Sequence, residues 1–353
     1  MGEIPRLPTE IISHIIASVV DESGTIYSPS HTVTKTLLSL TLVSRATYVF
    51  ASNHLRRQCM FIDDRKRLRD CVAYLKATNH LVPEYNSGKT KGAKAVPSGP
   101  QLWPITSLYL APIASDLIPG QTLEHIIELC TLIRPSLKRL IVDMPWQFAR
   151  QPDPSIDSDA LKIAFSSLSE LQDLVNLTNY YPPNYSVVAA SVAYEYVGGY
   201  LPEISRWPKL RRLALLDGVP TSSLWEDLRS SRALETFVFA KSSNPGYAWL
   251  KSYLGAARLE KPTAGTKPER PLKIVFAAQP QHPDMRDNGE GMSRLVSAKE
   301  LIDPDNLVNF SLYEYWALAA SKPARESFEY VKAAALRDEL WEWEGQIVSR
   351  SGL

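Results

Sequence analysis

The residues with the most obvious potential for chemistry form a Gly-Lys-Thr sequence at Gly88, Lys89 and Thr90. In a phosphate-binding loop such a sequence holds nucleotide phosphates, and another glycine stands five positions before the Gly-Lys pair. Pro83 occupies that position here, so we interpret the segment as a flexible basic loop. The chain also lacks the G-x-S-x-G and G-x-G-x-x-G patterns of serine hydrolases and dinucleotide-binding proteins. We therefore expect no catalytic nucleotide or acyl chemistry.

Histidine and cysteine, the usual zinc ligands, are scattered along the chain. The histidines are His14, His31, His54, His80, His125 and His282, and the cysteines are Cys59, Cys71 and Cys130. None of the histidines has a partner at close metal-ligand spacing, so we expect no metal and no cofactor. An odd number of widely spaced cysteines disfavours a disulfide framework and is typical of a reducing compartment. The acidic pair Glu226 and Asp227 has the residue types of a glycosidase, but such pairs on helices are more often solvated.

Composition favours a folded protein with local rather than global recognition surfaces. The chain has 353 residues, 44% of them hydrophobic, and a formal net charge of +1. A balanced charge gives no general attraction to nucleic acid or to an anionic membrane. The sequence has no apolar stretch of about 18 residues and no basic region leading into an apolar signal. We expect a cytoplasmic or nuclear protein that binds neither nucleic acid nor membrane.

The first part of the chain predicts three helices. From Leu7 to Val20, apolar residues recur at helical spacing and form one broad stripe, with Pro8 at the first helical position. A second helix is predicted over 36–57, with more apolar residues than one buried side requires. A third is predicted over 63–76. The Gly-, Pro-, Ser- and Lys-rich segment that follows predicts a linker. We therefore divide the chain into a helical module at 1–80, a linker or loop at 81–101 and a second region at 102–353.

The second region repeats a short apolar run of the form Leu-x-x-Leu-x-Leu. The runs begin at Ile105, Leu137, Leu171, Leu210, Leu234 and Leu272. Helical patterns lie between them, for example over 122–133 and 159–171, and this alternation predicts an α/β fold with parallel strands joined by helices. The spacings are mostly longer than the about 20 to 29 residues of regular leucine-rich repeats, so the region resembles an irregular solenoid of that kind. A strong helical pattern near the C-terminus predicts a helix that caps the end of the array.

The N-terminal residues resemble a known docking motif. The stretch LPTEIISHII followed by LLSLTLVSRATYVFASNHLRR resembles the F-box. This helical motif binds the Skp adaptor of cullin-based (SCF) ubiquitin ligases. The resemblance covers about a sixth of the chain and implies a non-catalytic adaptor in ubiquitin-dependent protein degradation, bound through Skp to a cullin. The residues expected to bind the Skp adaptor are Leu7, Pro8, Ile11, Ile12, Ile15, Leu38, Val43 and Leu55.

In F-box proteins the C-terminal region recruits the target protein. Strand positions that alternate with buried leucines are expected to point outward and to form a concave recognition face. The candidate target-binding residues on that face are Tyr109, Arg139, Ile141, Arg212 and Thr236. They are equally compatible with a solvated sheet surface.

Two other functions stay open at the level of sequence. In one, the chain is a repeat-array scaffold outside ubiquitin transfer, and its N-terminal helices are an end cap that packs on the array. In the other, it is a hydrolase whose site the sequence does not reveal, which requires a deep pocket with converging titratable groups.

Overall fold

The computed structural model confirms an α/β fold. It describes residues 7–20, 24–79, 104–112, 120–144, 158–177, 204–216, 228, 231, 233–242, 272–278, 308–314, 324–344 and 346–347. The predicted linker lies outside these residues, and so does a further helical pattern of the sequence, VVAASVAYEYVGGYL over 187–201.

The described strands form one nine-stranded sheet whose spatial order is the order of the strands in the chain. All pairings from β1 to β8 are parallel, and β9 pairs antiparallel with β8. The strands are β1 (Phe61–Ile62), β2 (Ser107–Leu110), β3 (Arg139–Val142), β4 (Asp173–Asn176), β5 (Arg212–Leu215), β6 (Thr236–Ser242), β7 (Leu272–Ala278), β8 (Val308–Glu314) and β9 (Gln346–Ile347). The six predicted apolar runs supply β2 to β7, so their parallel arrangement is confirmed.

Helices cover the sheet on both faces. The described helices are α1 (Thr9–Ala17), α2 (Thr32–Leu40), α3 (Arg45–Gln58), α4 (Arg65–Asn79), α5 (Gly120–Ile133), α6 (Ser158–Ser166) and α12 (Ala324–Leu336), with short 3₁₀ turns η3 (Ile204–Arg206) and η5 (Glu339–Glu342). One apolar cluster fills the space between the sheet and α4, α5 and α6. A second joins the opposite face to α12 and η5. Because both faces are covered, the central positions of the strands are apolar, and in β3 all four residues, Arg139 included, are buried.

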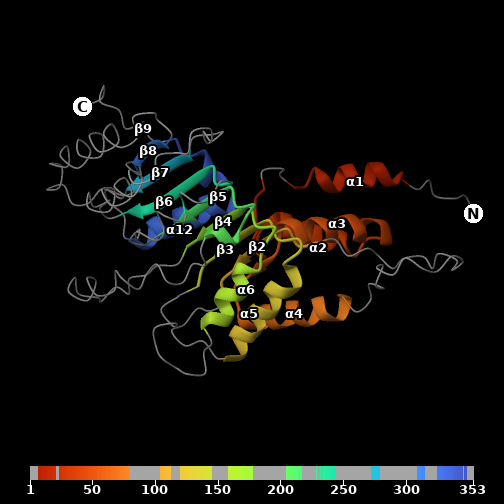
Figure 1. The fold of residues 1–353 in the computed structure, drawn as a ribbon. Helices are drawn as coiled ribbons and strands as arrows, with labels where there is room; N and C mark the ends of the chain where they lie inside the picture. The colour runs from red at the N-terminus through yellow and green to blue at the C-terminus, as the bar shows by residue number, and fades with distance from the viewer. Residues whose placement is uncertain are drawn as a thin grey trace, which may run out of the picture.

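The helices α1, α2 and α3 pack together as a unit near the end of the sheet formed by β1 and β2 (Figure 1). Their shared core is a separate cluster centred on Ile16, Leu37 and Ala51. Pro8 is the N-cap of α1 rather than its first residue. The single helix predicted over 36–57 is in fact two helices, because Ser44 and Thr47 form a capping box that starts α3 after a short turn.

The third predicted helix exists as α4, but it packs with the sheet. Its buried residues Leu68, Val72 and Leu75 belong to the cluster that they share with α5 and α6. The preceding strand β1 already pairs with β2. Packing therefore changes from the three-helix unit to the sheet near Phe61, earlier in the chain than the predicted boundary at residue 80.

The C-terminal helix occupies a different place from the one predicted. The sequence predicted a cap at the end of the array, whereas Val331, Ala334 and Ala335 of α12 are buried in the cluster on the sheet face. The end of the sheet next to β8 is covered instead by β9. A helix with one wholly apolar face gains more by covering a broad apolar sheet than by covering one edge strand, because the free energy gained scales with the apolar area buried.

Candidate protein-docking surface

The three-helix unit, which we call the α1–α3 module, completes its own core without most of the predicted docking residues. The fully buried members of that core are Ile16, Val20, Tyr27, Leu37 and Ala51. In α1, the side chains that face this core come from one side of the helix. The residues on the other side are therefore not needed to hold the module together.

Three large apolar side chains are exposed on the other side of α1 or directly before it. Leu7 is 61% exposed, Ile11 is 45% exposed and Ile15 is 51% exposed. Ile11 and Ile15 are four residues apart and form one stripe along the helix, and Leu7 stands just before the N-cap Pro8. Pro8 is also exposed at the start of the helix. No described part of the chain covers this stripe.

A second exposed apolar group lies at the end of α2 and in the turn that leads to α3. Leu38 is 50% exposed, Val43 is 69% exposed and Leu42 is 86% exposed. The amide of Leu42 donates to the carbonyl of Ser39, so the helical path tightens there and the chain turns. Ser44 then caps α3 and fixes the turn that holds Leu42 and Val43 outward.

Two exposed residues, Leu42 and Tyr48, were not among the predicted docking residues. Tyr48 is 44% exposed in the first turns of α3. Both fall within the single helix that the sequence predicts over 36–57. The signal that would have separated them is the Ser-x-x-Thr pattern of the capping box, which places a helix start at Ser44.

Two of the predicted docking residues are less accessible than expected. Ile12 and Leu55 are partly buried and pack against the module core. The exposed apolar residues of the module, which make up the candidate docking surface, are Leu7, Pro8, Ile11, Ile15, Leu38, Leu42, Val43 and Tyr48. We use the term docking surface for this set.

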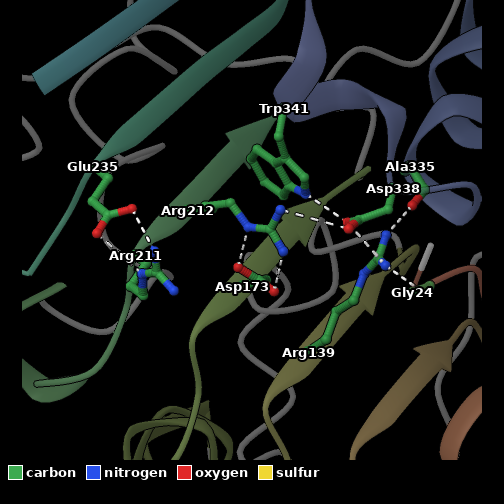
Figure 2. A network of polar contacts seen from close by, with 9 residues as sticks. All are labelled: Gly24, Arg139, Asp173, Arg211, Arg212, Glu235, Ala335, Asp338 and Trp341. Carbon is green, nitrogen blue, oxygen red and sulfur yellow. Dashed lines mark hydrogen bonds and ion pairs between the residues drawn. The ribbon is translucent and has the colours of Figure 1, made fainter. Parts of the chain in front are cut away.

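The predicted target-binding row on the sheet is not an open face. Tyr109 is 1% exposed, Ile141 is buried completely and Arg139 is 4% exposed, because α12 covers this side of the sheet. Arg212 and Thr236 are partly exposed, and Arg212 contacts Asp173 (Figure 2). The expected concave recognition face is therefore wrong for Tyr109, Arg139 and Ile141. The alternation of side chains along a strand correctly predicts which face of the sheet each residue is on. It does not predict that α12 covers that face.

The hydroxyl and the ring of Tyr109, which lie on this covered face, both have contacts within the buried layer. The hydroxyl of Tyr109 donates to Asp143 Oδ2 at 2.5 Å, and Lys332 Nζ of α12 lies 3.1 Å from the same oxygen. Burial and the Asp143 carboxylate raise the pKa of Tyr109 far above its ordinary value. The ring of Tyr109 stacks on Phe61 with 4.1 Å between centroids. These contacts fasten α12 to β2 and β3 and leave Tyr109 protonated, so it is unsuited to acid–base chemistry near neutral pH.

The described residues contain no group of three or more His, Cys, Asp or Glu side chains that is arranged to hold a metal ion. Within the same residues, no helix has the length and apolarity needed to cross a membrane. The most distinctive chemical feature of the described chain is thus the exposed apolar surface on α1–α3. No protein-family model and no curated protein matches this sequence.

Proposed function

We propose that this chain is the target-recognition subunit of an SCF-type cullin ubiquitin ligase. In this proposal the α1–α3 module is an F-box that binds the Skp adaptor, and the chain has no catalytic activity. The observation that carries the proposal is the exposure of Leu7, Ile11 and Ile15, which all lie outside the module core. The same residues belong to the sequence stretch that resembles the F-box.

An apolar surface of this kind favours a protein partner on energetic grounds. Burying one Leu, Ile or Val side chain that is otherwise in water contributes about 1.5 to 3 kcal/mol. Several such side chains gathered on one small module are costly to expose and are typical of an interface. The partner surface must be apolar and shaped to receive a helix face, which is how amphipathic helices dock in general.

The sheet with its helical layer is, in this proposal, an irregular leucine-rich-repeat-like array that binds the target protein. Its strands follow one another in chain order, as stacked repeats do. The target-binding surface excludes the part of the sheet that α12 covers. Ubiquitin transfer is then promoted by proximity, since other subunits supply the catalysis. Such a role places the protein in the cytosol or nucleus.

The direct test is binding of the full chain to purified Skp adaptor, measured by titration calorimetry. We expect the Ile11→Asp, Ile15→Asp double variant to bind at least tenfold more weakly, because it places two charges in the centre of the apolar interface. Residues at such centres contribute about 2 kcal/mol or more each, and 1.4 kcal/mol corresponds to tenfold in affinity. Both side chains lie outside the module core, so the variant is expected to keep its fold.

The matched control is Ile163→Asp on α6, because Ile163 is 68% exposed and lies far from the docking surface in the chain and on another helix. It should bind the adaptor like the unmodified chain. Undiminished adaptor binding by a folded Ile11→Asp, Ile15→Asp variant would rule out the assigned surface, and lack of binding by the unmodified chain would rule out the proposed function.

The scaffold alternative has one observation in its favour, which is that the α1–α3 module is bonded to the rest of the chain. The amide of Ile26 donates to the carbonyl of Leu336 in α12. Deleting residues 1–80 does not separate the two functions, because the deletion also removes β1 and α4 from the sheet. A measurement of adaptor binding distinguishes the ligase subunit from the scaffold, because a module that serves only as an end cap is not expected to bind Skp.

A further inference from the structure

The segment from Gly24 to Tyr27, between α1 and α2, takes part in two separate hydrophobic cores. Ile26 is 2% exposed and lies in the cluster between the sheet and α12. Its neighbour Tyr27 is 5% exposed and lies in the core of the α1–α3 module. Two adjacent side chains thus anchor one short segment in both units.

The backbone of the same segment is bonded on both sides. The amide of Ile26 donates to the carbonyl of Leu336 at 2.8 Å, at the end of α12. The amide of Tyr27 donates to the carbonyl of Gln58 at 2.7 Å, at the end of α3. The chain also passes directly from α3 to β1, so the module is attached to the sheet at two places.

Arg139 of β3 joins this segment to α12 and η5 (Figure 2). Its guanidinium donates from Nη1 to the carbonyl of Gly24 and from Nη2 to the carbonyl of Ala335. Nη1 also lies 2.9 Å from Asp338 Oδ1. The Arg139 side chain is only 5% exposed, so these contacts are made in a largely dry environment where hydrogen bonds of a charged group are strong.

Asp338 is itself held in place from the other side. Its Oδ1 accepts a hydrogen bond from Trp341 Nε1 at 2.8 Å, and its Oδ2 lies 3.5 Å from Arg212 Nη1. Arg212 is oriented by two hydrogen bonds to Asp173, one of them at 2.6 Å. The contacts in Figure 2 therefore form a chain from β4 and β5 through η5 to Arg139 and Gly24.

Gly24 is the residue type that this arrangement requires. Its φ is +77°, in the left-handed region that favours glycine. A Cβ at this position would lie 3.2 Å from Arg139 Nη1 and 3.2 Å from Asp338 Oδ2. Any side chain there would strain the backbone and press on the ion pair.

We propose that Gly24, Arg139 and Asp338 form a clamp through which the C-terminal segment fixes the orientation of the α1–α3 module relative to the sheet, with Arg139 as the positioning residue. The clamp is defined by these three residues. Its importance for presenting a target rests on the proposed function, since a ligase receptor must hold its target at a set place relative to the adaptor. The existence of the clamp does not depend on the proposed ligase function, because Gly24, Arg139 and Asp338 are not part of the docking surface.

The test is a distance measurement in the full chain by pulsed electron spin resonance. Spin labels are introduced through non-canonical amino acids, which avoids the three cysteines, at Lys35 on α2 and Lys162 on α6, both exposed. We expect a narrow distance distribution in the unmodified chain and a clearly broader one in Arg139→Met. The Arg139→Lys variant should restore part of the narrowing, because lysine keeps the charge but cannot reach three partners at once.

Two measurements distinguish a positioning role from a general loss of structure. A second label pair, at Lys66 on α4 and Lys162 on α6, reports on the sheet and its helical layer and should stay unchanged in Arg139→Met. The matched control is Arg211→Met, because the Arg211 pair with Glu235 is exposed and does not touch the module (Figure 2). Its Lys35 to Lys162 distribution should match that of the unmodified chain.

Gly24→Ala provides a second variant if Arg139→Met does not fold, since it alters the clamp from the module side and leaves β3 intact. It should also broaden the Lys35 to Lys162 distribution. An unchanged narrow distribution in either folded variant would overturn the clamp. Adaptor binding, measured on the same variants, is expected to stay within about threefold, so a failure of the proposed function is seen separately as absence of binding by the unmodified chain.

Discussion

Burial determines how the three cysteine thiols behave. Desolvation raises the pKa of Cys71 to about 11 and that of Cys130 to about 12, and it also raises the pKa of Cys59. A thiol reacts through its thiolate, so a raised pKa lowers reactivity near neutral pH. All three thiols are free in the structure.

We therefore expect slow alkylation of the native protein at pH 8. Iodoacetamide should modify Cys130 much more slowly in buffer than in 6 M urea, and the native rate at Cys71 should rise with pH up to about 11. Peptide mass spectrometry after timed quenching gives the rate at each cysteine. Equal rates at Cys130 with and without urea would contradict its burial. The native pKa of Cys71 lies above its ordinary value of 9.0, so the folded state favours the protonated thiol. The stabilisation that comes from this protonated thiol is fully present below pH 9.0 and is lost as the pH rises through about 11.

At the scale of elements, the turn between α2 and α3 decides where part of the docking surface points. The hydroxyl of Ser44 accepts from the amide of Thr47 at 3.1 Å, and the hydroxyl of Thr47 accepts from the amide of Ser44 at 2.9 Å. These two bonds satisfy amides that a helix start leaves without partners. They also set the direction in which Leu42 and Val43 project.

Replacing Ser44 by alanine should destabilise the protein by about 1 kcal/mol, as is typical for loss of an N-cap. Urea unfolding followed by far-UV circular dichroism measures the change. Ser39→Ala is the matched control, because Ser39 lies within α2 and its hydroxyl only donates to the carbonyl of Lys35. Its effect should be within about 0.5 kcal/mol of zero or stabilising. Equal losses in both variants would show that the capping box has no special role.

At the scale of the whole molecule, the two faces of the sheet carry separate apolar clusters that share the same strands. Leu129 of α5 is buried in one cluster and Leu340 of η5 in the other. Trp207 lies in the first cluster, and Trp341 and Trp343 lie in the second. Because each strand from β2 to β7 contributes to both clusters, we expect the faces to lose their structure together.

Both Leu129→Ala and Leu340→Ala should therefore lower one common unfolding transition. Each change is expected to cost about 2 to 5 kcal/mol, since it leaves a cavity in a close-packed core. Tryptophan fluorescence and far-UV circular dichroism, recorded on the same samples, should give coincident transitions. If the fluorescence and circular dichroism transitions of Leu340→Ala did not coincide, the two faces would not unfold as one cooperative unit. Ile163→Ala, at an exposed position on α6, serves as the control and should have little effect.

The sequence by itself determined the parallel α/β arrangement, because apolar runs such as LKRLIV and LRRLALL are too short for helices and alternate with helical patterns. It also singled out Leu7, Ile11 and Ile15, which the structure leaves exposed and outside the module core. Helical spacing is a local property, so it can be read directly from neighbouring residues.

Only the tertiary structure decided that α12 covers the sheet face and that Arg139 reaches Gly24 and Ala335. Gly24, Arg139 and Asp338 are far apart in the chain, and no local pattern specifies which distant segments meet. Alternation along β2 and β3 places Tyr109 and Ile141 opposite the leucines, but it does not say whether water or a helix lies against them. That choice depends on the total apolar area that α12 and the sheet remove from water together, which is a property of the whole fold.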